Sequence, residues 1–154
     1  MLEDCKTAHE RWGGTHEMID RWLENRKRTL VAYFKLKKDI AADQQAEPLQ
    51  DFCETLMDYV SAGHFEIYEQ LIREAREFDD GGLDLAHKLY PSLETTTEFI
   101  LYFNDKYDTA EQCAAHADEL PADLSKLGEQ MTERFELEDR LIERLHNIHR
   151  GQVA

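Results

Sequence analysis

A long stretch from Leu49 to Phe78 constrains the fold more than any other part of the chain. Its apolar or small residues recur at steps of three or four, the spacing that keeps one face of an α-helix toward a core. They stand at positions 49, 52, 56, 60, 63, 67, 71, 75 and 78. The pattern therefore predicts one long amphipathic helix whose apolar stripe is buried.

The middle of this stretch, from Asp58 to Phe65, departs from an ordinary core helix. Small residues cluster at Ser61, Ala62 and Gly63, where another backbone can approach closely, although glycine costs about 1 kcal/mol relative to alanine in a helix interior. Asp58 and Phe65 each lie two residues from a core position, which turns them about 200° away from the core. Asp58, Ala62 and Phe65 therefore share an outward strip that is typical of a docking surface.

The charge of the chain limits the partners it can attract. Its 154 residues carry 18 Lys and Arg against 33 Asp and Glu, a formal charge of −15. Such a chain repels nucleic-acid phosphates and anionic membranes, and it attracts basic partners, including proteins that themselves bind DNA. The acidity is equally consistent with a role in solubility alone. The length suits a single domain, residues 1–154, with one sizeable core.

The cysteines and the N-terminal sequence favour a cytoplasmic protein. Cys5, Cys53 and Cys113 are odd in number and widely spaced, so they predict neither a disulfide framework nor a zinc site. Cys53 is expected to fill the core. The N-terminal sequence is too polar for a signal peptide, and no apolar run approaches the length of a membrane span.

The remaining sequence predicts helices and no strands. Pro48, Pro91 and Pro121 each stand where a helix can begin. Residues 30–36 are apolar on several faces, which indicates deep burial or contact with a partner. We expect helices over residues 2–12, 15–38, 48–78, 91–107 and 121–149, a break or bend at 12–15, and short helices over 83–90 and within 108–120. The predicted fold is an all-α, up-and-down bundle of four long helices with short additional helices at the ends.

Five polar residues fall on or beside the apolar stripes of the predicted helices: Asp20, His64, Tyr68, Arg134 and Glu138. A bundle can bring them together as a buried network, which fixes helix register more than it adds stability. The simpler alternative is that Arg134 and Glu138 form a partly exposed i,i+4 pair worth about 0.2–0.5 kcal/mol. We expect the network, and we expect its role to be structural.

Helical bundles also hold di-iron sites, built from glutamates and two Glu-x-x-His pairs. Glu143 and His146 have this spacing, but a second pair on another helix is missing. No cysteine has the sequence context of a nucleophile, and no phosphate-binding loop is present. We therefore expect no enzyme activity, metal or cofactor, and a di-iron-like metal-binding bundle is the alternative.

Several motifs run in order along nearly the whole chain. They are Glu10-Arg11-Trp12-Gly13-Gly14, Asp20-Arg21-Trp22-Leu23, Asp51-Phe52-Cys53, the run from Asp58 to Phe65 with Tyr68-Glu69, Tyr90-Pro91 with Leu93-Glu94, Phe103-Asn104-Asp105, and the run from Glu133 to Asp139. Through these motifs the chain resembles the Rsd/AlgQ family of bacterial regulators, most of all its pseudomonad AlgQ branch. The run from Asp58 to Phe65 is the most specific motif, whereas the connectors 39–47 and 108–123 match poorly.

The resemblance implies an anti-sigma factor, a helical bundle that binds the C-terminal domain (region 4) of the primary sigma-70 factor. Region 4 reads the −35 promoter element and docks on core RNA polymerase, so its capture would block both contacts and favour alternative sigma factors. Family members are also linked to control of alginate and other secondary products. The implied partner is therefore the primary sigma factor, without direct binding of nucleic acid or membrane, and the protein is expected to be a monomer or a homodimer.

Under this interpretation six residues are predicted to contact sigma: Asp58, Ser61, Ala62, Phe65, Arg21 and Trp22. Asp58 would meet a guanidinium group, and Phe65 would be an apolar anchor beside Ala62. Trp22 is equally well placed in the core, which is the role we favour for it. A scaffold that binds some other basic or metabolic regulator is the remaining alternative.

Overall fold

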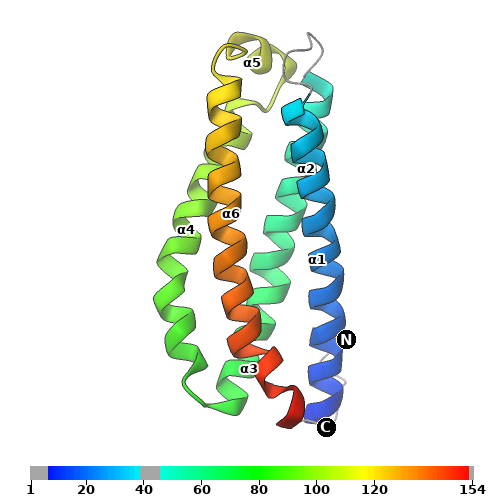
Figure 1. Cartoon of the computed structure of the whole chain (residues 1–154), viewed down its shortest axis with the longest axis vertical. Helices are drawn as coiled ribbons and strands as arrows, with labels where there is room; N and C mark the ends of the chain where they lie inside the picture. Colours follow the sequence, from blue (N-terminus) through cyan, green and yellow to red (C-terminus); the bar gives the residue numbers. More distant parts are fainter. Residues whose placement is uncertain (1–6, 39–45, 153–154) are drawn as a thin grey trace.

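The computed structural model describes residues 7–38 and 46–152, and every regular element within them is helical. The elements are α1 (Ala8–Lys38), α2 (Ala46–Ala62), the π-helical turn η2 (Gly63–Ile67), α3 (Tyr68–Phe78), α4 (Gly82–Lys106), α5 (Ala110–Ala115), α6 (Leu120–Leu145) and the 3-10 helix η3 (Asn147–Gln152). Because η2 joins α2 to α3, these elements form four long rods that run alternately up and down (Figure 1). The predicted all-α bundle of four long helices is confirmed.

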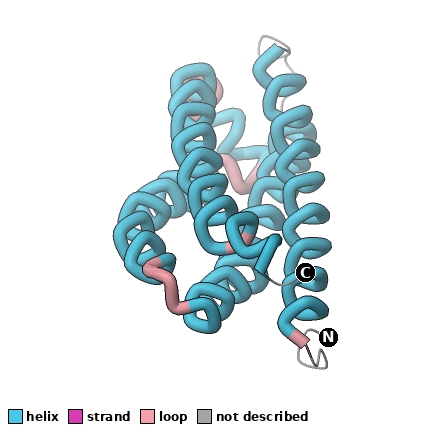
Figure 2. The backbone as a smooth tube through the Cα atoms, turned by 60° about the horizontal axis from the view of Figure 1, so that its bottom comes forward, coloured by secondary structure: helices cyan, strands magenta, loops and turns pink. Residues whose placement is uncertain are grey.

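The rods pack in two pairs that share one core. Helix α1 lies along α2, and α4 lies along α6, while α3 contacts both α4 and α6 (Figure 2). Short elements close the two ends, with α5 near the upper end of α2 and η3 beyond the end of α6 (Figure 1). The α2–η2–α3 rod therefore touches every other rod of the bundle.

The apolar stripe predicted between Leu49 and Phe78 is buried along its length. Eight of its nine positions are buried, and Phe78 is half-buried with its ring stacked 3.7 Å from the ring of His149. Cys53 also lies in the core, where burial raises the pKa of its thiol to about 12. The rod ends at Asp79, which adopts a left-handed conformation with φ of 46°.

The predicted break at residues 12–15 is wrong, because α1 continues through Gly13 and Gly14. Each glycine costs only about 1 kcal/mol in a helix interior. Tertiary contacts on both sides offset this cost, since Trp12 stacks on His146 at 4.3 Å and Thr15 is buried. Residues 2–6 of the predicted first helix lie outside the described residues.

Two of the three prolines lie where they were predicted, and the third does not. Pro48 and Pro121 stand in the first turns of α2 and α6, whereas Pro91 lies inside α4. Proline removes one helical hydrogen bond, here to the carbonyl of His87. Pro91 is exposed, and α4 continues past it as a curved helix instead of ending there (Figure 1). The buried face of α4, with Leu89 and Leu93, runs on across it.

Two further expectations are corrected in part. The segment 30–36 is buried on one side only, because Tyr33 and Leu36 lie in the core while Val31 and Phe34 are 64% and 62% exposed. The last long helix ends at Leu145, and the chain continues to Gln152 as the tighter 3-10 helix η3.

A close approach of α1 to α6 gives a test of the packing. A Cβ atom at Gly128 would overlap the hydroxyl of Tyr33, which donates a 2.9 Å hydrogen bond to the carbonyl of Leu124. Gly128→Ala is expected to lower the free energy of unfolding by about 1–2 kcal/mol, because overpacking outweighs the gain in helix propensity. The matched control is Gly13→Ala, since a Cβ there meets nothing within 4 Å, and it should raise stability by up to about 1 kcal/mol. Urea unfolding followed by circular dichroism measures both, and a Gly128→Ala protein as stable as Gly13→Ala would contradict the packing.

Candidate functional site

A π-helical turn interrupts the rod within the most specific sequence motif. The backbone N–H of Tyr68 donates to the carbonyl of Gly63, a bond that spans five residues instead of four. Gly63 is buried against Trp22, and a Cβ at Gly63 would lie 3.0 Å from the indole ring. Such turns insert one extra residue into a helix and are frequent at functional sites.

The outward strip of Asp58, Ala62 and Phe65 lies on the solvent side of this turn, and the exposed Ser61 belongs to it as a fourth residue. Asp58 and Ser61 are exposed, Ala62 is half-buried, and Phe65 is 77% exposed, more than any other large apolar side chain in the described residues. Arg21, on α1, is also exposed. The strip therefore combines an acid, two small residues and an unburied aromatic ring.

Trp22 does not belong to this exposed surface. It is 2% exposed, its indole N–H donates a 3.0 Å hydrogen bond to the carbonyl of Tyr59, and its ring stacks on that of Tyr59 at 4.7 Å. The prediction that Trp22 contacts a partner is corrected accordingly. Its place under Gly63 makes it a support for the outward strip.

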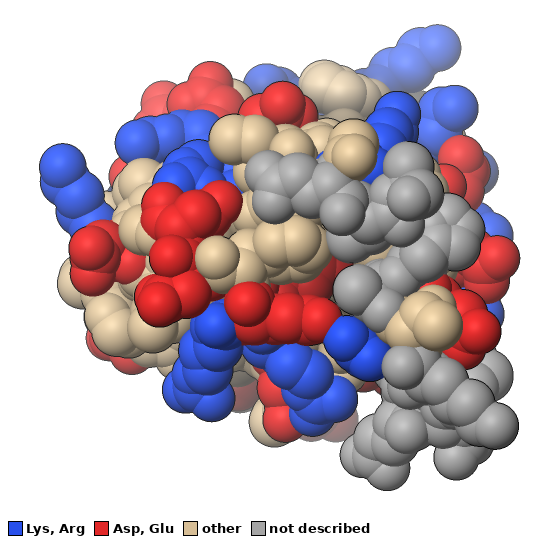
Figure 3. Space-filling model, turned by 90° about the horizontal axis from the view of Figure 1, so that it is seen from below, with Lys and Arg blue, Asp and Glu red and all other residues tan. Residues whose placement is uncertain are grey.

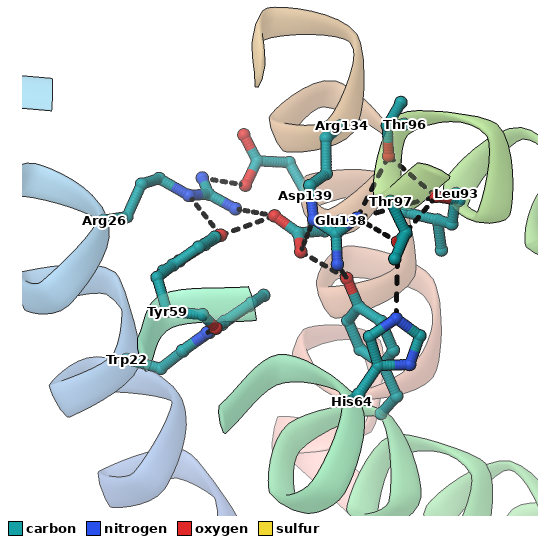
Figure 4. Close-up of polar contacts among 11 residues, drawn as sticks. Trp22, Arg26, Tyr59, His64, Leu93, Thr96, Thr97, Arg134, Glu138 and Asp139 are labelled. Atoms are coloured by element: carbon teal, nitrogen blue, oxygen red, sulfur yellow. Dashed lines mark hydrogen bonds and ion pairs between the residues drawn. The ribbon is translucent and has the colours of Figure 1, made fainter. Parts of the chain in front are cut away.

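Beneath the strip, a buried carboxylate is surrounded by donors from four helices, α1, α2, α3 and α6 (Figure 4). Glu138, on α6, is 1% exposed, and the hydroxyls of Tyr59 and Tyr68 each donate a short hydrogen bond to one of its oxygens. Two guanidinium groups complete its surroundings: the Nε of Arg134 and the Nη2 of Arg26 each lie 3.3 Å from a carboxylate oxygen. The negative charge of Glu138 is thus compensated inside the bundle.

Arg134 extends the network to the fourth rod. Its side chain is fully buried, and it donates to the hydroxyls of Tyr68 at 3.1 Å, Thr97 at 2.7 Å and Thr96 at 3.0 Å. The Nε2 of His64 lies 3.4 Å from the hydroxyl of Thr97 (Figure 4). Arg134 therefore is not part of an exposed i,i+4 pair, because it links α6 to both α3 and α4.

Asp20 is the one predicted member that the structure does not bring into the network. It is exposed on α1, and its carboxylate lies 3.6 Å from the Nε2 of His16. The sequence prediction also missed Arg26 and Tyr59, although Arg26 follows Trp22 by four residues and so falls on the inward face of α1. The hydroxyls of Thr96 and Thr97, and Asp139, which accepts from Arg26, were missed as well.

Burial sets the electrostatics of this network. Burial raises the pKa of Glu138, while Arg134, the two tyrosine hydroxyls and Arg26 act to lower it. The pKa of Tyr59 lies well above its usual value, first because of burial and then because of the Glu138 charge. The pKa of His64 is lowered by burial and by Arg134, so its imidazole is neutral near pH 7. Tyr59 and Tyr68, whose pKa values are both raised, thus remain protonated donors at neutral pH.

The comparison with known proteins decides the family. Residues 1–146 match the sequence profile described as the regulator of RNA polymerase sigma(70) subunit, Rsd/AlgQ. The chain belongs to the Rsd/AlgQ family. It is 36% identical over 148 residues to the "Regulator of sigma D" of Yersinia pseudotuberculosis serotype O:1b (strain IP 31758), covering 93% of this chain and 88% of that protein. It is 40% identical over 150 residues to the "Regulator of sigma D" of Salmonella newport (strain SL254), covering 92% of this chain and 90% of that protein.

The Rsd/AlgQ family is one of sigma-factor regulators and not of enzymes. The described helices also lack the combination of length and apolar character that a membrane span requires. The resemblance deduced from the motifs is therefore confirmed at the level of the family.

The alternative of a di-iron-like site in this Rsd/AlgQ protein receives no support. The two residues of the Glu-x-x-His pair are engaged separately: Glu143 is exposed and accepts from Asn147, whereas His146 is fully buried with its Nδ1 2.9 Å from the carboxylate of Glu74. Among residues 7–38 and 46–152, no group of three or more His, Cys, Asp and Glu side chains is arranged to hold a metal ion.

The buried histidine belongs to a second cluster, which fastens the chain end to the bundle. The Nε2 of His146 lies 3.1 Å from the Nδ1 of His16, and the indole N–H of Trp12 donates to the carbonyl of His146 at 3.0 Å. His149, also fully buried, lies 2.8 Å from Asp80, and this hydrogen bond lowers the pKa of Asp80 to about 2. The surface at this end mixes acidic and basic side chains (Figure 3), so the excess of acid is not concentrated there.

The buried ion pair gives a second test. Arg134→Met removes the fully buried one of the two cations beside Glu138 and is expected to lower the free energy of unfolding by about 3–5 kcal/mol. The double variant Arg134→Met/Glu138→Leu should lose less than the sum of the single variants, because the two groups interact directly. Asp139→Asn, which alters only the exposed partner of Arg26, is the matched control and should cost less than about 1 kcal/mol. Additive losses in this double-mutant cycle would contradict the direct interaction of the pair.

The loss of stability in Arg134→Met is expected to depend on pH. Removing Arg134 raises the pKa of Glu138 further above its ordinary value, so the charged carboxylate destabilises the fold most at neutral and higher pH. As the pH falls toward the ordinary glutamate pKa of about 4.3, Glu138 takes up a proton and this cost is relieved. The stability deficit of Arg134→Met relative to wild type is therefore expected to shrink on acidification, as measured by urea unfolding between pH 8 and pH 5. A deficit that grows on acidification would contradict this assignment.

Proposed function

We propose that this protein is an anti-sigma factor that binds the C-terminal domain (region 4) of the primary sigma factor through the outward strip Asp58, Ser61, Ala62 and Phe65. The observation that carries the proposal is that Phe65, within the π-helical turn, is 77% exposed. The chain also belongs to a family of sigma(70) regulators. A large aromatic ring held in water by a rigid helix is the kind of residue that dominates binding once it enters a pocket.

Charge supports a basic partner. The formal charge of −15 favours encounter with a DNA-binding domain, whose surface is basic, and such complementarity sets association rate and specificity more than affinity. Asp58 offers a carboxylate for a guanidinium group on sigma, which is the stronger, charge-assisted type of hydrogen bond. Arg21, exposed on the neighbouring helix α1, would extend the contact surface.

The strip is pre-organised from the inside of the bundle. Tyr59, His64 and Tyr68 alternate with the outward residues along the chain, and all three make polar contacts on the inward side. Trp22 fills the space under Gly63. Little conformational entropy is then lost when a partner docks, which favours affinity for a given contact area.

Binding to region 4 would inhibit sigma by covering the surfaces that it uses for its other contacts. The same domain of sigma reads the −35 element and docks on core polymerase, so a bundle bound to it would block both contacts and leave polymerase to alternative sigma factors. Altered transcription, including that of alginate and other secondary-product genes, would follow in the cytoplasm. The protein would act as a monomer or a homodimer, without metal, cofactor or direct contact to nucleic acid.

Charge reversal on the strip tests the proposal. Asp58→Arg is expected to abolish binding to the isolated sigma C-terminal domain, because it replaces an attraction by a repulsion against a basic surface. Its helical circular-dichroism spectrum should be unchanged, since Asp58 is exposed. Glu98→Arg, which also reverses an acidic charge but at an exposed site on α4, is the matched control and should bind normally. Isothermal titration calorimetry at fixed salt measures both, and unimpaired binding by Asp58→Arg would remove this residue from the interface.

Truncation of the aromatic anchor is the companion experiment. Phe65→Ala is expected to weaken binding to the sigma domain by about 1–3 kcal/mol, because a buried aromatic anchor would be lost. Affinity capture of the intact protein from a lysate of its own cells, with the partners identified, separates the proposal from its rival. Recovery of a different basic regulator without any sigma factor would favour the scaffold alternative.

A further inference from the structure

A hollow that is lined by none of the outward-strip residues has the character of a ligand site. It has a volume of about 260 Å³ and lies between α3, α4 and α6. Tyr68, whose hydroxyl bonds Glu138, forms part of its wall, so the hollow borders the buried network. It is lined by Tyr68, Leu71, Ile72, Ala86, His87, Tyr90, Leu93, Leu141 and Leu145.

The lining excludes charged and strongly polar molecules. Six of its nine residues are aliphatic, and the hydroxyl of Tyr68 is already engaged by Glu138 and Arg134. The two other polar side chains, His87 and Tyr90, are exposed, so they stand at the solvent side of the hollow. A charged ligand would lose its hydration without a partner, and water inside would find few hydrogen bonds.

The size of the hollow narrows the ligand class. An apolar cavity of about 150 Å³ stays dry and holds benzene. A hollow of about 260 Å³ has room for a somewhat larger molecule, such as a bicyclic aromatic or an eight-carbon chain. We propose that this pocket binds a small uncharged apolar molecule, whose one polar end lies toward His87 and Tyr90.

Two features of α4 account for the opening. Ala86 is the smallest residue of the lining, and it is buried, so any longer side chain there would project into the space. Pro91 follows Tyr90 directly, and a proline inside a helix removes one backbone hydrogen bond and favours a kink. The lining residues of α4 stand on both sides of this proline, at 86, 87, 90 and 93.

The test uses the full chain alone, so its outcome is separate from that of the anti-sigma proposal. Protein with labelled Leu, Ile and Ala methyl groups is titrated with indole and with 1-octanol, followed by methyl NMR, and octanoate is the charged counterpart of octanol. We expect saturable one-to-one shifts centred on the methyls of Leu71, Ile72, Ala86 and Leu93, and clearly weaker binding of octanoate. Shifts that do not saturate, or that spread evenly over the surface, would overturn the proposal.

A filled pocket provides the control. Ala86→Leu should weaken binding of indole about tenfold or more, because the added carbons occupy the ligand volume. Ala122→Leu, the same change at an exposed position of α6, should leave binding unchanged. If Ala86→Leu does not fold, the smaller change Ala86→Val should weaken binding in the same direction. If Ala86→Leu or Ala86→Val binds indole as tightly as wild type does, the proposal is overturned. It is also overturned if the sigma domain shifts the methyl signals of this pocket while indole and 1-octanol do not.

Discussion

The bundle depends on the compensation of one buried carboxylate. Glu138 is 1% exposed, and an ion in such a place costs several kcal/mol unless charges and hydrogen bonds surround it. The compensation comes from every rod: Arg26 on α1, Tyr59 on α2, Tyr68 on α3, and Arg134, which is itself held by threonines of α4. Any slip of one helix along another would leave a buried charge or hydroxyl unpaired. The network therefore selects one register for helices whose apolar stripes alone would tolerate several.

This inner constraint also shapes the outer surface. Tyr59 and Tyr68, which bind the same carboxylate, stand on either side of the π-helical turn between Gly63 and Ile67. An ordinary α-helix of this length would present the two hydroxyls at a different angle, so the extra residue of the turn and the shared carboxylate belong together. Phe65 lies within the turn, and its outward direction follows from the same geometry that points Tyr68 inward.

The parts of the fold that the sequence predicts are those governed by periodicity. The stripe from Leu49 to Ala75 required only the 3.6-residue repeat, because burial of apolar side chains dominates helix packing. The errors occur where a tertiary contact outweighs a local preference. Gly13 and Gly14 remain helical because Trp12 is packed against His146, and Pro91 remains helical because the stripe of α4 continues past it. Local rules favour a break at both places.

Helical periodicity also predicted most of the polar network, because four of its residues fall on or beside the apolar stripes: His64, Tyr68, Arg134 and Glu138. Arg26 was harder to find, because an arginine on an inward helix position is ordinarily excluded from a core. Its guanidinium lies over the ring of Phe135 at 4.7 Å, which shows how the aromatic residues around it make that position tolerable. Asp20 also has helical spacing from the apolar stripe, yet it is exposed, with its carboxylate 3.6 Å from the imidazole of His16, so spacing alone does not decide burial.

The proposed contact with sigma must extend beyond the strip itself. A stable protein interface covers about 800 Å² on each partner, roughly 20–30 residues, and the strip has four. Helix α1 lies along α2 and carries two further exposed apolar side chains, Val31 and Phe34, at 64% and 62% exposure. Neither belongs to the buried core. Val31 lies about 80° around the helix from the exposed Arg21, whereas Phe34 lines a hollow between α1 and α6. If the outward strip is the centre of the interface, the interface would extend onto the solvent-exposed side of α1. There a partner would also cover apolar surface that the bundle leaves in water.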